Sequence, residues 1–226
     1  MTNLALFDLD HTLLPIDSDK EWGRFLVRIG AVDGPAYTKA NEAFYQDYST
    51  GNLDMPAYLR FCLAPLAQYT RDQLDTWHAQ YMKAIIEPAI RAEAIALLNK
   101  HRIAGDLCCI VSATNTFVTT PIAHALGIKH LIGTRPATMG DYPNARYTGN
   151  YIGTPSFREG KISCTETWLK TLGKTWGDFE HSFFYSDSAN DVPLMEKVTH
   201  PVATNPDEPL RAIALARRWP ILELFT

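Results

Sequence analysis

The chain has 226 residues, 46% of them hydrophobic and 20% charged, which is the composition of an ordinary soluble globular protein. Its formal net charge of -4 argues against a surface that binds polyanions, because nucleic-acid binders usually carry a basic excess. No stretch approaches the roughly 20 apolar residues of a membrane span, and the N-terminal stretch lacks the basic region and apolar run of a signal peptide. We therefore expect a cytoplasmic protein with no nucleic-acid or membrane partner; the oligomeric state is left open.

Short apolar runs predict the strands of a parallel sheet. Residues 4–7, 107–111, 182–185 and 201–203 have the length and composition of buried strands. The first three end abruptly in acidic or hydroxyl-bearing residues. Ligands of parallel sheets lie beyond the carboxyl ends of the strands, so these polar ends indicate one shared site.

Helix patterns lie between the predicted strands. One helix is expected to begin near Pro88, to present apolar residues between 90 and 98 on one face, and to end before Gly105. Others are expected over residues 165–172 and 192–198. The alternation predicts an α/β fold, a doubly wound Rossmann-like core.

Residues 133–160 are rich in Gly, Pro, Thr and Tyr. We expect a small β-hairpin there, at the rim of the sheet, with strands over 145–148 and 151–154 on either side of Gly149 and Asn150.

Residues 17–87 do not follow this alternation. Four successive stretches place apolar residues on one helical face: Trp22, Phe25, Leu26 and Ile29; Tyr37, Ala40, Phe44 and Tyr48; Met55, Leu59, Cys62 and Leu66; Leu74, Trp77, Tyr81 and Ile85. They predict a helical cap domain over 17–87, inserted into a core domain of residues 1–16 and 88–226. Because the insert begins a few residues after Asp10, we expect it to cover the site as a lid.

Asp8 and Asp10 directly follow the first predicted strand. Two carboxylates held this close among buried neighbours need a cation, because like charges raise each other's energy. A hard, oxygen-seeking ion such as Mg²⁺ satisfies this need and also attracts phosphate. The alternative is an acidic turn at the end of a strand.

Three further places along the chain can complete such a site. Asp187 and Asp191 follow the third strand, where a neighbouring strand would bring Asp187 close to the same ion. Ser112 follows the second strand, and such a turn can hold phosphoryl oxygens. Lys161 lies near a helix start, where it could neutralise phosphate and carboxylates. Taken singly, each could also be a cap, a turn residue or a surface lysine.

The ordered set resembles the four motifs of the haloacid dehalogenase superfamily. The matching residues are Asp8-Leu9-Asp10-His11-Thr12, Ser112, Lys161 and the segment from Asp187 to Asp191. The resemblance spans the core, and the helical insert is similar to the cap that the superfamily carries between its first two motifs. Within the superfamily, the chain is most similar to the phosphoserine phosphatase branch.

The resemblance implies a Mg²⁺-dependent phosphatase. Asp8 would attack phosphorus to form an aspartyl-phosphate, and Asp10 would act as acid and base. Mg²⁺ would be held by the Asp8 carboxylate, the Asp10 backbone carbonyl and Asp187. The other implied roles are phosphate binding by Ser112 and Lys161, fixing of Asp10 by Thr12, and a place for Asp191 beside the metal ligands. Since dehalogenases lack the second aspartate, dehalogenation is not expected.

The cap departs from the phosphoserine phosphatases. Cys62 stands where those enzymes carry the arginine that binds the substrate carboxylate, although Arg60 is nearby, and Asp17 stands where they carry a glutamate for the substrate amine. Similar sequences with this cap pattern are often labelled histidinol-phosphatases. The substrate is therefore expected to be an amino-alcohol or amino-acid phosphate, with Asp17 or Asp19 pairing with the amine.

Two other classes of protein share part of the pattern. A phospho-aspartate receiver domain also combines aspartates, Ser or Thr, and Lys, but its phosphorylated Asp lies on a later strand and it has no helical insert of this size. A catalytically inactive relative that serves as a binding module would be expected to have lost some motif residues, whereas all of them are present here.

Overall fold

The computed structural model describes residues 2–225 and contains one seven-stranded sheet. The strands lie in the order β4-β3-β2-β1-β5-β6-β7. Their bounds are β1 Leu4–Phe7, β2 Leu107–Asn115, β3 His130–Thr138, β4 Tyr147–Ile152, β5 Ser182–Ser186, β6 His200–Thr204 and β7 Ile221–Leu222. Every pairing is parallel except that of β3 with β4.

Strand β1 is the centre of the sheet, and its four residues are completely buried. Phe7 packs with the helices on one face, whereas Leu6 packs with those on the other, as alternate side chains of a strand must. The chain leaves β1 for β2 on one side and later returns to β5 on the other. The carboxyl end of β1 is thus the point where the strand order reverses, which is where doubly wound sheets bind ligands.

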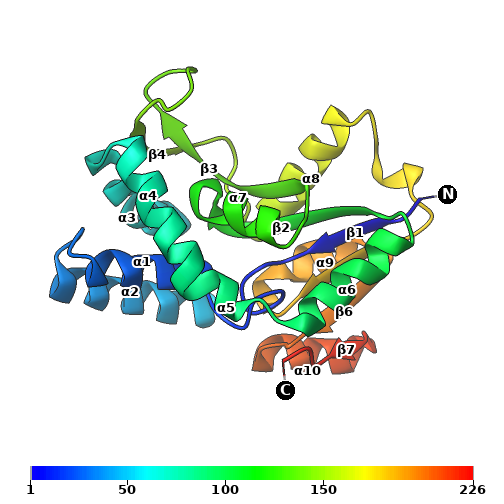
Figure 1. Cartoon of the computed structure of the whole chain (residues 1–226). Coiled ribbons are helices and arrows are strands. Elements are labelled where there is room, and N and C mark those ends of the chain that lie inside the picture. Colours follow the sequence, from blue (N-terminus) through cyan, green and yellow to red (C-terminus); the bar gives the residue numbers. More distant parts are fainter. Residues whose placement is uncertain (1, 226) are drawn as a thin grey trace.

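Helices cover both faces of the sheet (Figure 1). The core helices are α6 Ala92–Ile103 before β2 and, after it, α7 Thr116–Ala125, α8 Glu159–Thr171, α9 Val192–Lys197 and α10 Glu208–Arg217. Two 3₁₀ turns lie at Trp176–Asp178 and Ala189–Asp191. The doubly wound α/β core predicted from the sequence is confirmed. The helix expected to begin near Pro88 is divided, because Ile90 and Arg91 are extended and α6 begins at Ala92.

All the regular elements between β1 and α6 are helices, with no strand among them. They are α1 Ser18–Arg28, α2 Gly34–Ser49, α3 Met55–Gln68, α4 Arg71–Tyr81, a π-helical turn Met82–Ile86 and α5 Glu87–Ala89. In Figure 1, α1 to α4 lie in blue and cyan to the left of the sheet. This agrees with the expected run of helices, while the boundaries of a separate cap domain stay a prediction.

The hairpin was predicted with the wrong strands. Gly149 and Asn150 lie inside β4, and the partner strand is β3, which the sequence pattern did not reveal. Gly149 has a φ of +81°, and a Cβ there would lie 3.4 Å from the Cβ of Ala67 on α3. The glycine therefore permits close contact with the insert rather than a turn.

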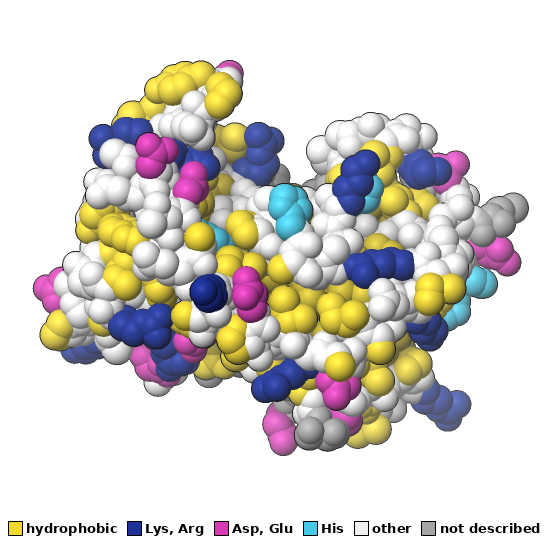
Figure 2. All heavy atoms as spheres, viewed as in Figure 1, with side chains coloured by type: hydrophobic (Ala, Val, Ile, Leu, Met, Phe, Trp, Pro, Cys, Tyr) yellow, Lys and Arg dark blue, Asp and Glu magenta, His cyan; other side chains and the backbone are white. Residues whose placement is uncertain are grey.

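The surface carries charges of both signs. On the face shown in Figure 2, Lys and Arg side chains are interspersed with Asp and Glu, and hydrophobic side chains gather around α5 and α6. Within residues 2–225, no helix has both the length and the apolar character needed to cross a bilayer.

Candidate active site

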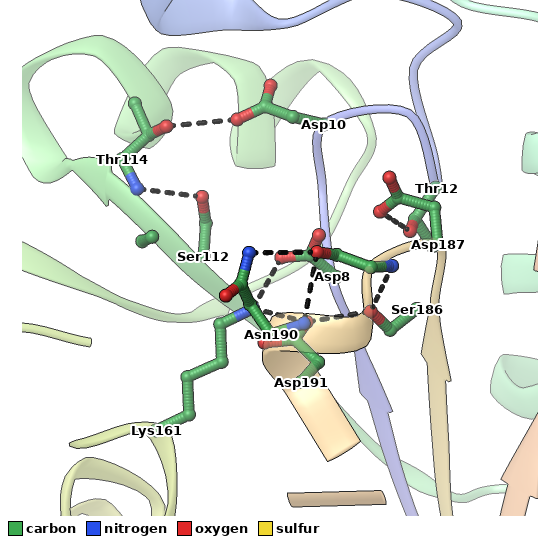
Figure 3. Close-up of polar contacts among 12 residues, drawn as sticks. Asp8, Asp10, Thr12, Ser112, Thr114, Lys161, Ser186, Asp187, Asn190 and Asp191 are labelled. Atoms are coloured by element: carbon green, nitrogen blue, oxygen red, sulfur yellow. Dashed lines mark hydrogen bonds and ion pairs between the residues drawn. The ribbon is translucent and has the colours of Figure 1, made fainter. Parts of the chain in front are cut away.

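Parallel neighbours of β1 bring the predicted site residues to one edge of the sheet. Asp8 and Asp10 follow β1, Ser112 lies near the end of β2, and Asp187 follows β5. Asp191 ends the 3₁₀ turn after β5. Figure 3 shows these side chains converging beyond the carboxyl ends of the strands.

Lys161 connects two of the carboxylates. From the first turn of α8, its Nζ lies 2.8 Å from Asp8 Oδ1 and 2.6 Å from Asp191 Oδ2, and all three side chains are buried. Burial alone would lower the pKa of the Lys161 ammonium, but the charges of Asp191 and Asp8 raise it overall. Lys161 therefore stays protonated and fixes the position of Asp8.

Both carboxylate oxygens of Asp10 accept hydrogen bonds. The backbone N–H of Ser18 donates to Oδ1 over 2.7 Å, and the Thr114 hydroxyl donates to Oδ2 over 2.9 Å. Burial, followed by the nearby charge of Asp17, raises the pKa of Asp10 to about 6. A carboxyl group with this pKa can exist in both protonation states near neutral pH, as an acid/base catalyst requires.

Thr114 has the contact with Asp10 that the resemblance implied for Thr12. Thr12 Oγ1 donates to Asp187 Oδ1 over 3.0 Å, so it orients Asp187 and not Asp10. Thr114 is the threonine that orients Asp10. Its backbone N–H donates to Ser112 Oγ over 3.1 Å. The only sequence signal for Thr114 was its place two residues after the motif serine.

The site holds more negative than positive charge. The carboxylates of Asp8, Asp10, Asp187 and Asp191 outnumber the cations near them, and the Lys161 ammonium pairs only with Asp8 and Asp191. Burial raises the pKa of Asp187 well above its usual value, and the charges of Asp8 and Asp191 raise it further. Ionised together at neutral pH, these carboxylates require an additional cation, so the donor set fits Mg²⁺.

The metal would need few protein side chains. Across residues 2–225, no three His, Cys, Asp or Glu side chains converge as a ready set of metal ligands. Mg²⁺ commonly takes only one or two carboxylates and completes its shell with water and substrate phosphate. Asp8 and Asp187, with the Asp10 carbonyl, match that requirement.

A pocket between core and insert contains the site. Its lining includes Asp8, Asp10, Ser112 and Lys161 from the core. The insert contributes Asp17, Lys20 and an aromatic set consisting of Phe44, Tyr45, Tyr48 and Tyr58. A substrate whose phosphate sits at Asp8 would therefore extend its organic part against aromatic rings and a carboxylate.

The three predicted specificity residues have different positions. Asp17 lines the pocket and caps α1 by accepting a 2.8 Å hydrogen bond from the Lys20 N–H. Asp19 is buried away from the lining, where it accepts hydrogen bonds from Tyr58 and Asn115. Arg60 is exposed and does not line the pocket. Its neighbour Leu59 faces the core, and adjacent helical residues point about 100° apart, so Arg60 points outward.

Together, the doubly wound sheet, the lysine-paired aspartate and the excess of carboxylates define an enzyme site for an anionic substrate that binds with a cation. Comparisons with known proteins identify the family. Residues 5–196 match the haloacid dehalogenase-like hydrolases. The chain is 46% identical over 222 residues to a histidinol-phosphatase of Neisseria meningitidis, covering 98% of this chain and 99% of that protein.

Solved structures agree. A Bordetella pertussis protein described as having unknown function is 47% identical, with a TM-score of 0.92 and full coverage of both chains. A substrate-bound phosphoserine phosphatase has a TM-score of 0.69 at 17% identity, covering 99% of this chain and 93% of that one, which shows a shared fold.

The chain belongs to the haloacid dehalogenase-like hydrolase family. It is a phosphatase, a phosphoric monoester hydrolase of small phosphorylated metabolites. This assignment sets aside the receiver-domain alternative.

Proposed function

We propose that the protein is a Mg²⁺-dependent, cytoplasmic phosphatase that hydrolyses a small amino-alcohol phosphate through an aspartyl-phosphate. The observation that carries the mechanism is the bridge from Lys161 to Asp8 and Asp191 at the end of β1. It holds one carboxylate in a fixed orientation at the switch point of the sheet, as in-line attack on phosphorus requires.

The chemistry divides between Asp8 and Asp10. Asp8 attacks phosphorus, and the bond to the leaving oxygen breaks as Asp10 donates a proton to that oxygen. Asp10, now ionised, then takes a proton from the water that attacks the aspartyl-phosphate, which releases phosphate and restores Asp8. The pKa of about 6 for Asp10 suits both transfers.

Phosphate binding falls to Ser112 and Lys161. Ser112, near the end of β2, belongs to the pocket lining, and the Lys161 ammonium lies beside Asp8, so both can donate hydrogen bonds to phosphoryl oxygens. Asp8, Asp187 and the Asp10 carbonyl would hold Mg²⁺, which supplies charge neutralisation at the transferred group. Thr12 orients Asp187, and Asp191 orients Lys161.

The pocket lining favours an amine over a carboxylate on the substrate. Among the described residues, the pocket lining includes no arginine that could bind a substrate carboxylate. Cys62, at the position of that arginine in phosphoserine phosphatases, does not line the pocket, and Arg60 points away from it. Asp17 offers a carboxylate for an ammonium, and the aromatic set offers faces for a planar ring. These features support an amino-alcohol phosphate such as histidinol phosphate, in agreement with the name of the Neisseria relative.

A phosphate-release screen of metabolites with Mg²⁺ tests this proposal. We expect histidinol phosphate to be turned over with a kcat/KM well above that of phosphoserine, and Asp8→Asn to remove turnover of both. A preference for phosphoserine would contradict the substrate, and wild-type activity of Asp8→Asn would contradict the mechanism. Failure to hydrolyse any phosphate monoester would favour the inactive binding module.

A further inference from the structure

Lys20 is a pocket cation with no part in the mechanism above. It lies on α1 and lines the pocket, and only 13% of its side chain is exposed. Its Nζ lies 3.1 Å from Glu42 Oε2 and 3.4 Å from the centre of the Tyr45 ring, both on α2. Glu42 is half-exposed and lies outside the pocket lining.

The charge of Lys20 acts inside the pocket. Lys20 lines the same cavity as Asp17 and His11, so its charge faces the space that the substrate would occupy. Unpaired, an ammonium at this place would attract a substrate carboxylate and repel a substrate amine, with an effective interaction that is strong because water is largely excluded. The pocket would then suit an amino-acid phosphate.

Glu42 prevents this by position and charge. A carboxylate 3.1 Å from Nζ neutralises most of the ammonium's field, and the Tyr45 ring face holds the ammonium from a second direction. Both partners come from α2, so these contacts join α1 to α2 at the pocket wall.

We propose that Glu42 is a specificity-determining residue. By pairing with Lys20, it keeps that ammonium from attracting a carboxylate on the substrate, so that the pocket selects phosphorylated amines that carry no carboxylate. This rests on the amino-alcohol phosphate proposed above. Glu42 acts through Lys20 and does not touch the substrate, which makes it a positioning residue.

The test compares two substrates that differ only by a carboxylate, O-phosphoserine and O-phosphoethanolamine. In Glu42→Gln, we expect the ratio of kcat/KM for phosphoserine to that for phosphoethanolamine to rise about tenfold, mainly through KM. Glu42→Asp, which keeps the charge, should restore most of the wild-type ratio. In the double variant Glu42→Gln, Lys20→Gln, the rise should disappear because the freed cation is gone.

Asp47→Asn is the matched control, since Asp47 lies exposed on the same helix, outside the pocket lining, and loses the same charge. We expect it to leave the ratio unchanged. An unchanged ratio in Glu42→Gln, or a rise that persists in the double variant, would overturn the role of Glu42. The wild-type ratio of kcat/KM for the two substrates tests the proposed substrate class by itself. If the wild type favours phosphoserine over phosphoethanolamine, that class is wrong, whatever the result for Glu42→Gln.

Discussion

The Thr114 hydroxyl donates a 2.9 Å hydrogen bond to Asp10 Oδ2 and so joins the end of β2 to the loop that follows β1. The other oxygen of Asp10 is held by the N–H of Ser18, the first residue of α1. The proposed acid/base is therefore oriented by the core and by the helical insert at once.

Thr114→Val removes the hydroxyl while keeping the shape of the side chain. We expect kcat to fall about tenfold or more with a small change in KM, because a hydrogen bond to a charged group contributes roughly 1.5–3 kcal/mol. Steady-state kinetics measure this, and Thr114→Ser should keep most of the activity. Equal losses in the Ser and Val variants would show that packing, not the hydrogen bond, matters at this position.

The raised pKa of Asp10 predicts a pH-dependent stability. The folded-state pKa is about 6 against an ordinary 3.8, so Asp10 contributes stability that is fully present below pH 3.8 and is lost as pH rises through about 6. In metal-free protein, Asp10→Asn should therefore gain stability relative to wild type across this window, on the order of 3 kcal/mol at pH 7.

Denaturant unfolding of both proteins at pH 4.5 and pH 7, with EDTA, measures this difference. The comparison between variants is needed because His11 and His78 have lowered pKa values, which act in the opposite direction as pH falls. Mg²⁺ should stabilise the wild type more at pH 7 than at pH 4.5, since its ligands must be ionised. A pH-independent difference between wild type and Asp10→Asn would contradict the assigned pKa.

Lys161→Met leaves Asp8 and Asp191 buried without their shared counter-ion. We expect the free energy of unfolding at pH 7 to fall by roughly 3–5 kcal/mol, the usual effect of breaking a buried ion pair. Urea denaturation measures it. Lys170→Met, at an exposed position of the same helix, should change stability little; comparable losses in both variants would mean that helix α8, not the ion pair, is responsible.

Arg158 connects the helical insert to the 3₁₀ turn Ala189–Asp191. Its Nη2 donates to the Gly51 carbonyl over 2.6 Å and its Nε donates to Asn190 Oδ1 over 3.0 Å, next to Asp191. Arg158→Ala should speed hydrogen exchange in residues 48–52 and lower stability by about 1–2 kcal/mol through the two lost hydrogen bonds. Arg158→Lys keeps the charge but cannot reproduce the fork, so it should show an intermediate effect. Unchanged hydrogen exchange in residues 48–52 of Arg158→Ala would show that Arg158 does not hold this segment in place.

The sequence by itself determined that strands and helices alternate in the core, where β1, β2, β5 and β6 lie, and the approximate place of the site. Apolar runs that end in polar residues are local signals, and parallel neighbours necessarily bring such ends together. Asp8, Asp10, Ser112 and Asp187 could be placed for that reason. Strand β3 was not predicted, because Gly133 and Pro136 interrupt its apolar pattern.

Only the tertiary structure decided which partner each of these groups meets. Thr12 follows β1 and Thr114 lies near the end of β2, and which one reaches Asp10 depends on how these neighbouring segments are arranged in space. Arg60 and Asp19 belong to amphipathic helices whose rotation against the core sets which side chains face the pocket. Hydrogen bonds and ion pairs such as Lys20 with Glu42 form between segments distant in sequence. Local periodicity shows which face of a helix is apolar but not which segment that face packs against. The lining of the substrate pocket is therefore decided by the tertiary packing of the helices.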